Sequence, residues 1–258
     1  MEQLIRHFRN EKESGLLLID YPTGVGKTYN AISYMEKHKD DEIIFFITPL
    51  KKNLFDAYKK LKRRIKDKKW FDSNVILLKS NFDSLCENIL NIDNNEEDVL
   101  LEKESFKNLR NGIKIYKDTK NDSMKEIIER DEKRFRNDVE QYLRKYDSKK
   151  EKYFFIKDNH PWLIKLYPGI ESENKKIWFM TLDKFLSGNT TLISPTYKFV
   201  ENIIISKSTI FIDEIDSTKN KVLDFEIRNY LDNKLDLFEI FNIAQSRLHK
   251  NFLKNYLK

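Results

Sequence analysis

Cysteine and glycine are scarce in this chain of 258 residues, which has one cysteine and six glycines. The single cysteine, Cys86, excludes an intramolecular disulfide, an iron–sulfur cluster and a zinc site built on several cysteines. No apolar run approaches the length of a membrane span, and the N-terminus has no apolar signal core. These absences favour a cytoplasmic protein without membrane contact.

Charged residues, by contrast, are abundant and make up 35% of the chain. Basic residues outnumber acidic ones, so the formal net charge is +6. A basic balance favours a polyanionic partner such as nucleic acid, although diffuse lysine also serves solubility. The length suits one large domain or two small ones with a real core.

Strand-like and helix-like segments alternate in the first 90 residues. Short apolar runs predict buried strands at 15–20, 42–49 and 74–80. Helical spacing of apolar residues predicts helices at 27–39, 50–65 and 82–90. This alternation predicts an α/β fold with a mainly parallel sheet between helices.

The alternation stops at about residue 91, and strand-like runs return at 176–181 and 208–216. Between 123 and 146, apolar residues at three- and four-residue steps predict one long amphipathic helix. We therefore predict a charged helical subdomain at 91–152, inserted into a discontinuous nucleotide-binding domain formed by 1–90 and 153–232. The charged face of the insert suits solvent or, alternatively, nucleic acid. Residues 233–258 predict a C-terminal helical segment.

Two of the six glycines lie in one short segment, PTGVGKT, which follows a predicted strand and opens a predicted helix. It comprises Pro22, Thr23, Gly24, Val25, Gly26, Lys27 and Thr28. Glycine at two positions lets backbone N–H groups surround a phosphate, and the helix start adds its unpaired N–H groups. Lys27 can reach the β- and γ-phosphates of a nucleotide, and the Thr28 hydroxyl can bind Mg²⁺. This segment predicts an ATP–Mg²⁺ site.

The second candidate site is an acidic segment, TIFIDEID. Here Asp213 and Glu214 stand at the end of a predicted buried strand. Ligands of open α/β sheets bind at the carboxyl ends of the strands. Adjacent strand residues point to opposite faces, so each carboxylate can have its own task. We predict that Asp213 holds Mg²⁺ and that Glu214, with Lys27, is catalytic, Glu214 by activating water.

Together, PTGVGKT and DEID resemble the first two nucleotide motifs of superfamily 2 helicases and translocases, the class that includes DEAD-box and DEAH-box proteins. ITPLKKNL at 47–54 and FMTLDKFLSG at 179–188 are similar to two further motifs of that family, in the same order. The resemblance covers about 1–90 and 175–216. It implies the first RecA-like domain of a P-loop ATP hydrolase that couples hydrolysis to movement on DNA or RNA.

The resemblance also implies roles for single residues. Thr48, Pro49 and Thr181 would contact the nucleic-acid backbone without regard to sequence, and Gln3 would read the adenine. The family's second RecA-like domain has no counterpart here, which favours a fragment or truncated product. Such a chain needs a second RecA-like domain, in cis or from a partner protein, and alone would hydrolyse ATP very slowly.

Two other interpretations stay open. FIDEIDS also resembles the acidic motif of AAA+ ATPases, although the phosphate loop and the long separation of the two motifs differ from that class. A nucleotide-gated binding module without turnover would keep the same motifs. A P-loop kinase is disfavoured, because no acceptor site is marked.

Overall fold

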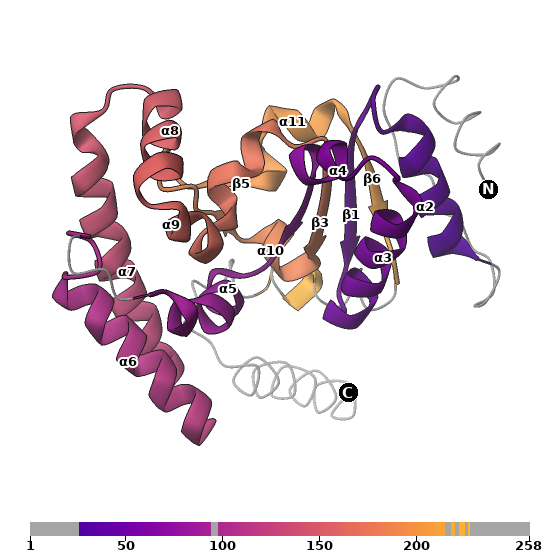
Figure 1. Ribbon diagram of the computed structural model, residues 1–258. Coiled ribbons are helices and arrows are strands. Elements are labelled where there is room, and N and C mark those ends of the chain that lie inside the picture. The colour runs from indigo at the N-terminus through magenta and orange to yellow at the C-terminus, as the bar shows by residue number, and fades with distance from the viewer. Residues whose placement is uncertain (1–25, 94–97, 215–217, 220–221, 225–226, 228–258) are drawn as a thin grey trace, which may run out of the picture. The chain divides into compact units, whose positions relative to one another are not determined.

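The computed structural model describes residues 26–93, 98–214, 218–219, 222–224 and 227 (Figure 1). The predicted strand at 15–20 and the predicted helical segment at 233–258 lie outside these residues. By its internal contacts the chain divides into two compact units, Met1–Asp213 and Glu214–Lys258. In the described part, no helix is both long and apolar enough to cross a membrane.

Four parallel strands form the main sheet, in the order β2-β3-β1-β6. They are β1 (Ile43–Thr48), β2 (Val75–Leu78), β3 (Ile177–Thr181) and β6 (Ser208–Ile212). The strands predicted at 42–49, 74–80, 176–181 and 208–216 are confirmed, with β6 ending earlier than predicted. The chain is thus α/β with a mainly parallel sheet, which is compatible with a RecA-like domain and with other α/β folds.

One face of the sheet is covered by α2 (Lys27–His38), α3 (Lys51–Arg64) and α4 (Lys68–Asn74). Residues two apart on a strand share a face, so Ile44 and Phe46 of β1 both join this core. The apolar stripe of α3 meets them through Leu54, Ala57 and Leu61, all essentially buried. The helices predicted at 27–39 and 50–65 are therefore confirmed, and their apolar sides form this core.

The opposite face of the sheet carries an aromatic cluster. Phe45 of β1 stacks on Trp178 of β3 with ring centroids 5.2 Å apart. Phe185 of α10 (Leu182–Leu186) and Phe199 of η4 (Phe199–Glu201) pack against Phe45 at 6.4 and 6.2 Å. The chain then continues through α11 (Ile203–Ser206) into β6. A separate antiparallel pair, β4 (Gly188–Asn189) with β5 (Tyr197–Lys198), precedes η4.

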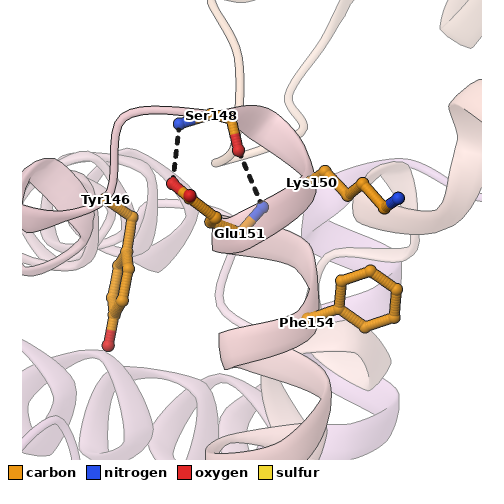
Figure 2. Close-up of a pocket in the computed structure, with 5 residues that line it drawn as sticks. All are labelled: Tyr146, Ser148, Lys150, Glu151 and Phe154. Atoms are coloured by element: carbon orange, nitrogen blue, oxygen red, sulfur yellow. Dashed lines mark hydrogen bonds between the residues drawn. The ribbon is translucent and has the colours of Figure 1, made fainter.

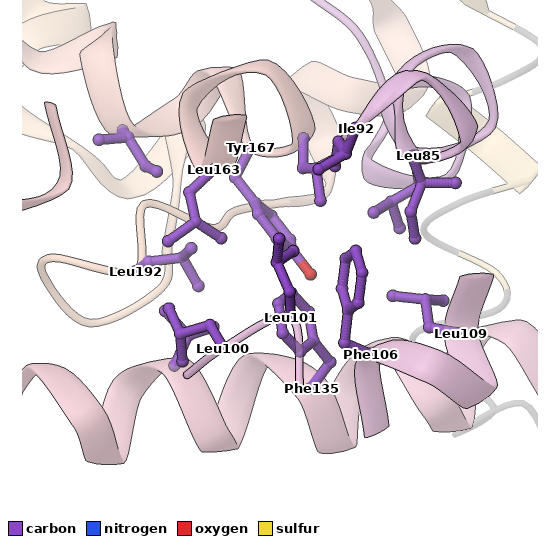
Figure 3. Close-up of a cluster of buried hydrophobic side chains, with 14 of the residues drawn as sticks. Leu85, Ile92, Leu100, Leu101, Phe106, Leu109, Phe135, Leu163, Tyr167 and Leu192 are labelled. Carbon is purple, nitrogen blue, oxygen red and sulfur yellow. The ribbon is translucent and has the colours of Figure 1, made fainter. Parts of the chain in front are cut away.

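A helical segment separates β2 from β3, and its apolar side chains converge on a second core (Figure 3). Its elements are α5 (Asn81–Asn88), η1 (Ile89–Asn91), α6 (Glu104–Thr119), α7 (Met124–Tyr142), η2 (Leu143–Lys145), α8 (Lys149–Asn159), α9 (Pro161–Leu166) and η3 (Pro168–Asn174). Phe106 of α6 and Phe135 of α7 pack together there, with centroids 5.2 Å apart. The long helix predicted within 123–146 and the helix predicted at 82–90 are confirmed.

The helical segment differs from prediction at its end and in its charges. It extends to Asn174, past the predicted boundary at 152, because Leu163 and Tyr167 belong to the same buried core as α7. Two acidic residues of α7, Asp131 and Glu132, are also only 7% and 8% exposed. The charged face of this helix is therefore not wholly solvated.

Candidate functional site

Thr28 and Asp213 meet at the carboxyl edge of the sheet, although they are 185 residues apart in the chain. The backbone N–H of Asp213 donates to Ile47 O at 2.9 Å, which extends the β6–β1 ladder by one residue. Phe211 lies two residues earlier and contacts Tyr34 of α2, so this side of β6 faces α2. The Thr28 hydroxyl, at the start of α2, donates to Asp213 Oδ2 at 3.2 Å.

The start of α2 has the features of an anion-binding helix end. Gly26 precedes the helix with φ of 78°, a left-handed conformation that favours glycine. Gly26 has no side chain that could cap this end, and the N–H groups of a first helical turn lie at the positive end of the helix dipole. Lys27 is the first helical residue, as the phosphate-loop prediction requires.

Asn30 also belongs to this helix start, and sequence analysis missed it. Its Nδ2 donates to Gly26 O at 2.9 Å, while the Asn30 backbone N–H donates to the same oxygen at 2.9 Å. The two bonds fix Gly26, the second glycine of the segment, against the helix. The sequence pattern that could have indicated this contact is an asparagine four residues after a glycine at a helix start. That pattern is too common to single out Asn30 by itself.

Several predicted site residues lie outside the described part of the chain: Gln3, Pro22, Thr23, Gly24 and Val25. Of the phosphate loop, only Gly26, Lys27 and Thr28 are described. The adenine role of Gln3 and the backbone cradle of the loop therefore stay predictions.

Glu214 directly follows Asp213 but does not continue the strand. Its φ is 59°, in the left-handed region that residues with a side chain rarely adopt. Its carbonyl accepts from the Thr218 N–H at 3.0 Å. The alternating-face argument therefore applies to Asp213, which still pairs with β1, and not to Glu214. Positive φ at a non-glycine residue is strained backbone of the kind found at functional sites.

Thr48 and Thr181 are register partners at the carboxyl ends of β1 and β3. Thr48 is completely buried, and its Oγ1 lies 3.4 Å from the backbone N of Leu50. The Thr181 hydroxyl accepts from the Lys184 N–H at 3.3 Å and so caps α10. The two predicted contact residues thus lie side by side, with Thr48 and the adjacent Pro49 both buried in this structure.

The turn after Thr48 offers exposed groups in their place. Leu50 is 48% exposed and precedes α3, whose first turn has no side-chain cap. Lys51 and Lys52 follow, and both are exposed. A helix start with lysines favours an anion such as phosphate, and Lys51 already pairs with an acidic group there, Asp83, at 2.7 Å.

A buried polar cluster next to Thr181 was not foreseen. Arg136 of α7 donates from Nη1 to Thr190 Oγ1 at 3.1 Å and lies 3.4 Å from Glu132 Oε2 through Nη2. Burial raises the pKa of Glu132, and Arg136 partly offsets that effect. Lys184 of α10 donates from Nζ to Gly188 O at 3.1 Å, and burial lowers its pKa to about 8. This cluster links the helical segment to the loop after β3.

Among residues 26–93 and 98–214, and the few described beyond them, no group of three or more histidine, cysteine or acidic side chains is arranged as a metal site. A metal at the sheet edge would therefore depend on the Thr28–Asp213 pair together with groups of a ligand. A scan of the chain against protein-family models finds no match, and a search of curated proteins finds none either.

Proposed function

We propose that this chain binds ATP–Mg²⁺ at the carboxyl edge of its sheet and is the first motor domain of a superfamily 2 helicase or translocase. The hydrogen bond between Thr28 and Asp213 is the observation on which the proposal rests most. It joins the last residue of a phosphate-loop pattern to the first acid of a DEID pattern.

The pair fits a magnesium ion by chemistry and by spacing. Mg²⁺ takes oxygen ligands in octahedral geometry at 2.0–2.1 Å, so two adjacent ligands lie about 3 Å apart. Thr28 Oγ1 and Asp213 Oδ2 are 3.2 Å apart, close to this spacing. Thr28 would ligate the ion, and Asp213 would hold it directly or through water. The bound ion would neutralise charge on the nucleotide phosphates.

The residues around this pair would have separate tasks. Lys27 would pair with the β- and γ-phosphates, and the positive dipole end of α2 would add to the attraction for them. Glu214 would orient water or accept its proton. Its strained backbone supports a functional rather than a purely structural role. Without an arginine from a second RecA-like domain, in cis or from a partner, hydrolysis by this chain would be very slow.

Nucleic acid would bind at the ends of β1 and β3. The chain leaves β1 through α3 on one face and leaves β3 through α10 on the other. Adjacent strands whose connections leave to opposite faces form a topological switch point, where open α/β sheets bind ligands. Thr48 and Thr181 mark this point, and the uncapped start of α3 provides N–H groups for a phosphate.

Substitution of Lys27 tests the nucleotide site. Lys27→Ala should abolish binding of a fluorescent ATP analogue, whereas Lys59→Ala, an exposed lysine on α3, should bind like the parent. Asp213→Asn should weaken only the magnesium-dependent part of the affinity. Circular dichroism would verify that the variants fold. Parent-like affinity in folded Lys27→Ala would refute the site.

A further inference from the structure

A hollow of about 540 Å³ opens at the start of α8, within the helical segment (Figure 2). None of its residues belongs to the sheet or to the candidate nucleotide site. Five residues line it: Tyr146, Ser148, Lys150, Glu151 and Phe154. The volume falls within the range of roughly 300–1,000 Å³ that small ligands occupy. Phe154 is 46% exposed there, so a large aromatic ring faces solvent beside a concave surface.

The walls of the hollow are held in place by local contacts. Ser148 and Glu151 form a capping box, in which Ser148 Oγ accepts from Glu151 N–H and Glu151 Oε2 accepts from Ser148 N–H, both at 3.1 Å. The Tyr146 ring packs on Phe155 with centroids 4.5 Å apart. These contacts fix Tyr146, Ser148 and Glu151, so the wall of the hollow beside Lys150 and Phe154 is ordered before a ligand binds, which lowers the entropic cost of binding.

The acidic residue of the hollow, Glu151, is hydrogen-bonded to the helix end, whereas its basic residue, Lys150, can contact a ligand. Hydrogen bonds from Ser148 lower the pKa of Glu151, so its carboxylate stays charged and directed at the helix end. Lys150 lies one turn before Phe154, and Figure 2 shows both side chains on the same side of α8. Within the described part of the chain, Lys150 forms no ion pair. An exposed ring and an exposed ammonium thus stand next to each other.

The surrounding sequence interleaves basic and aromatic residues. Residues 144–158 contain six basic, three acidic and four aromatic side chains. One of the lysines, Lys145, lies over the Tyr142 ring at 4.2 Å and the Phe155 ring at 4.8 Å, so its charge remains at this surface. Positive charge with aromatic faces is the combination that binds single strands, because every base has a face that stacks.

We propose that the start of α8 is a second nucleic-acid site, in which a base of a single strand stacks on Phe154 within the hollow and Lys150 pairs with an adjacent phosphate. The site has no part in nucleotide binding and is independent of the ends of β1 and β3. It gives the helical segment a function of its own: holding the strand at a point away from the sheet edge, irrespective of sequence.

The test uses the full chain without ATP and measures fluorescence anisotropy of labelled 15-mers of dT and dA. Phe154→Ala should weaken binding about tenfold, as expected for loss of one stacked base, and Phe154→Trp should retain it. Ile115→Ala is the matched control. Ile115 on α6 is 45% exposed, so its substitution by alanine also removes exposed apolar surface. Lys150→Ala should lower the slope of log K against log salt by about 0.7, the contribution of one single-strand phosphate. Lys133→Ala, an exposed lysine on α7, should not.

Three outcomes would overturn the inference: no binding at low salt, parent-like binding by Phe154→Ala, or an equal loss in Ile115→Ala. Thermal unfolding of each variant verifies that a weaker signal is not a loss of fold. Lys27→Ala separates this inference from the proposed function, because it should lose ATP and keep the Phe154-dependent binding. If the parent bound no ATP but Phe154→Ala still weakened oligonucleotide binding, the α8 site would stand and the motor proposal would fail.

Discussion

Thr48 and Thr181 are direct register partners on adjacent parallel strands, although they are 133 positions apart in the chain and the whole helical segment lies between them. Both end their strands, and the chain departs from them to opposite faces of the sheet. Each hydroxyl already contacts the backbone N of the helix that follows, at Leu50 and at Lys184. The relationship therefore ties two helix starts to one edge of the sheet.

Joint removal of the two hydroxyls should weaken nucleic-acid binding. We expect Thr48→Val with Thr181→Val to lower affinity for unrelated oligonucleotides, because the two hydroxyls hold the helix starts at the sheet edge. The loss should be the same factor for each sequence, because backbone contacts read no bases. Affinity for ATP should not change. Anisotropy at two salt concentrations is the measurement, and affinity should fall steeply as salt rises.

A control variant separates the effect of the hydroxyl from that of the rest of the side chain. Thr181→Val also removes the cap of α10, which costs about 1 kcal/mol, whereas Thr181→Ser keeps a capping hydroxyl. Thr181→Ser should therefore bind like the parent. If the double variant is folded and binds as tightly as the parent, the sheet edge is not a nucleic-acid site.

Glu214 should matter for turnover and not for ATP affinity. Glu214→Gln keeps the size of the side chain but cannot accept a proton, so we expect ATP hydrolysis to fall by a factor of about 10²–10⁴. ATP affinity should stay within a few-fold. Phosphate release from radiolabelled ATP, followed over hours, is sensitive enough for a slow enzyme.

Glu126→Gln on the exposed side of α7 is the matched control for that substitution and should hydrolyse ATP like the parent. Retention of parental turnover by Glu214→Gln would remove Glu214 from the catalytic role. A module that binds nucleotide without turnover would then become the better interpretation.

Lys184 should make stability depend on pH. Burial lowers its pKa from the ordinary 10.5 to about 8 in the folded chain, so between these values the unfolded chain binds more protons. The free energy of unfolding should therefore rise as pH increases from 8 to 10.5, by at most about 3 kcal/mol. Below pH 8 both states carry the charge, and the cost of burying it is constant.

Urea unfolding of the parent and of Lys184→Met, between pH 7 and 10, isolates this contribution. The methionine variant should be the more stable of the two at pH 7, and the difference should shrink or reverse by pH 10. Lys133→Met, on the exposed side of α7, should follow the parent at every pH. A constant difference across the range would mean that Lys184 does not titrate there.

Local pattern predicted the elements that depend on neighbouring residues. The apolar runs IIFFIT and IWFMT specify buried strands because no polar side chain interrupts them. The stripe Leu54, Leu61 and Ile65 specifies α3 because helical periodicity places these residues on one side. The chemistry of the phosphate loop was also local, since a glycine, a lysine and a threonine follow one another.

The pairing of distant groups needed the tertiary structure. Nothing in the order of the segments shows that β3 lies between β1 and β2, or that Thr48 is buried beside Thr181. The extension of the helical segment to Asn174 was missed because α8 and α9 are short, and their apolar side chains, such as Ile156 and Leu163, join the core of α7 only in the folded chain. Burial of Lys184 follows from its packing near Glu132 and Gly188, not from its own neighbours in TLDKF.

By itself, then, the sequence determined the four described strands of the sheet, the helices α2, α3, α5 and α7, and which residues could meet a phosphate, because those properties follow from spacing along a few turns or one loop. Only the tertiary structure decided that Thr28 reaches Asp213, that Glu214 leaves the strand with a left-handed backbone, and that Lys150 and Phe154 border one hollow. The physical reason is that strand order, burial and the closing of a site depend on contacts between residues far apart in the chain. No periodicity in a sequence encodes the partner across such a contact.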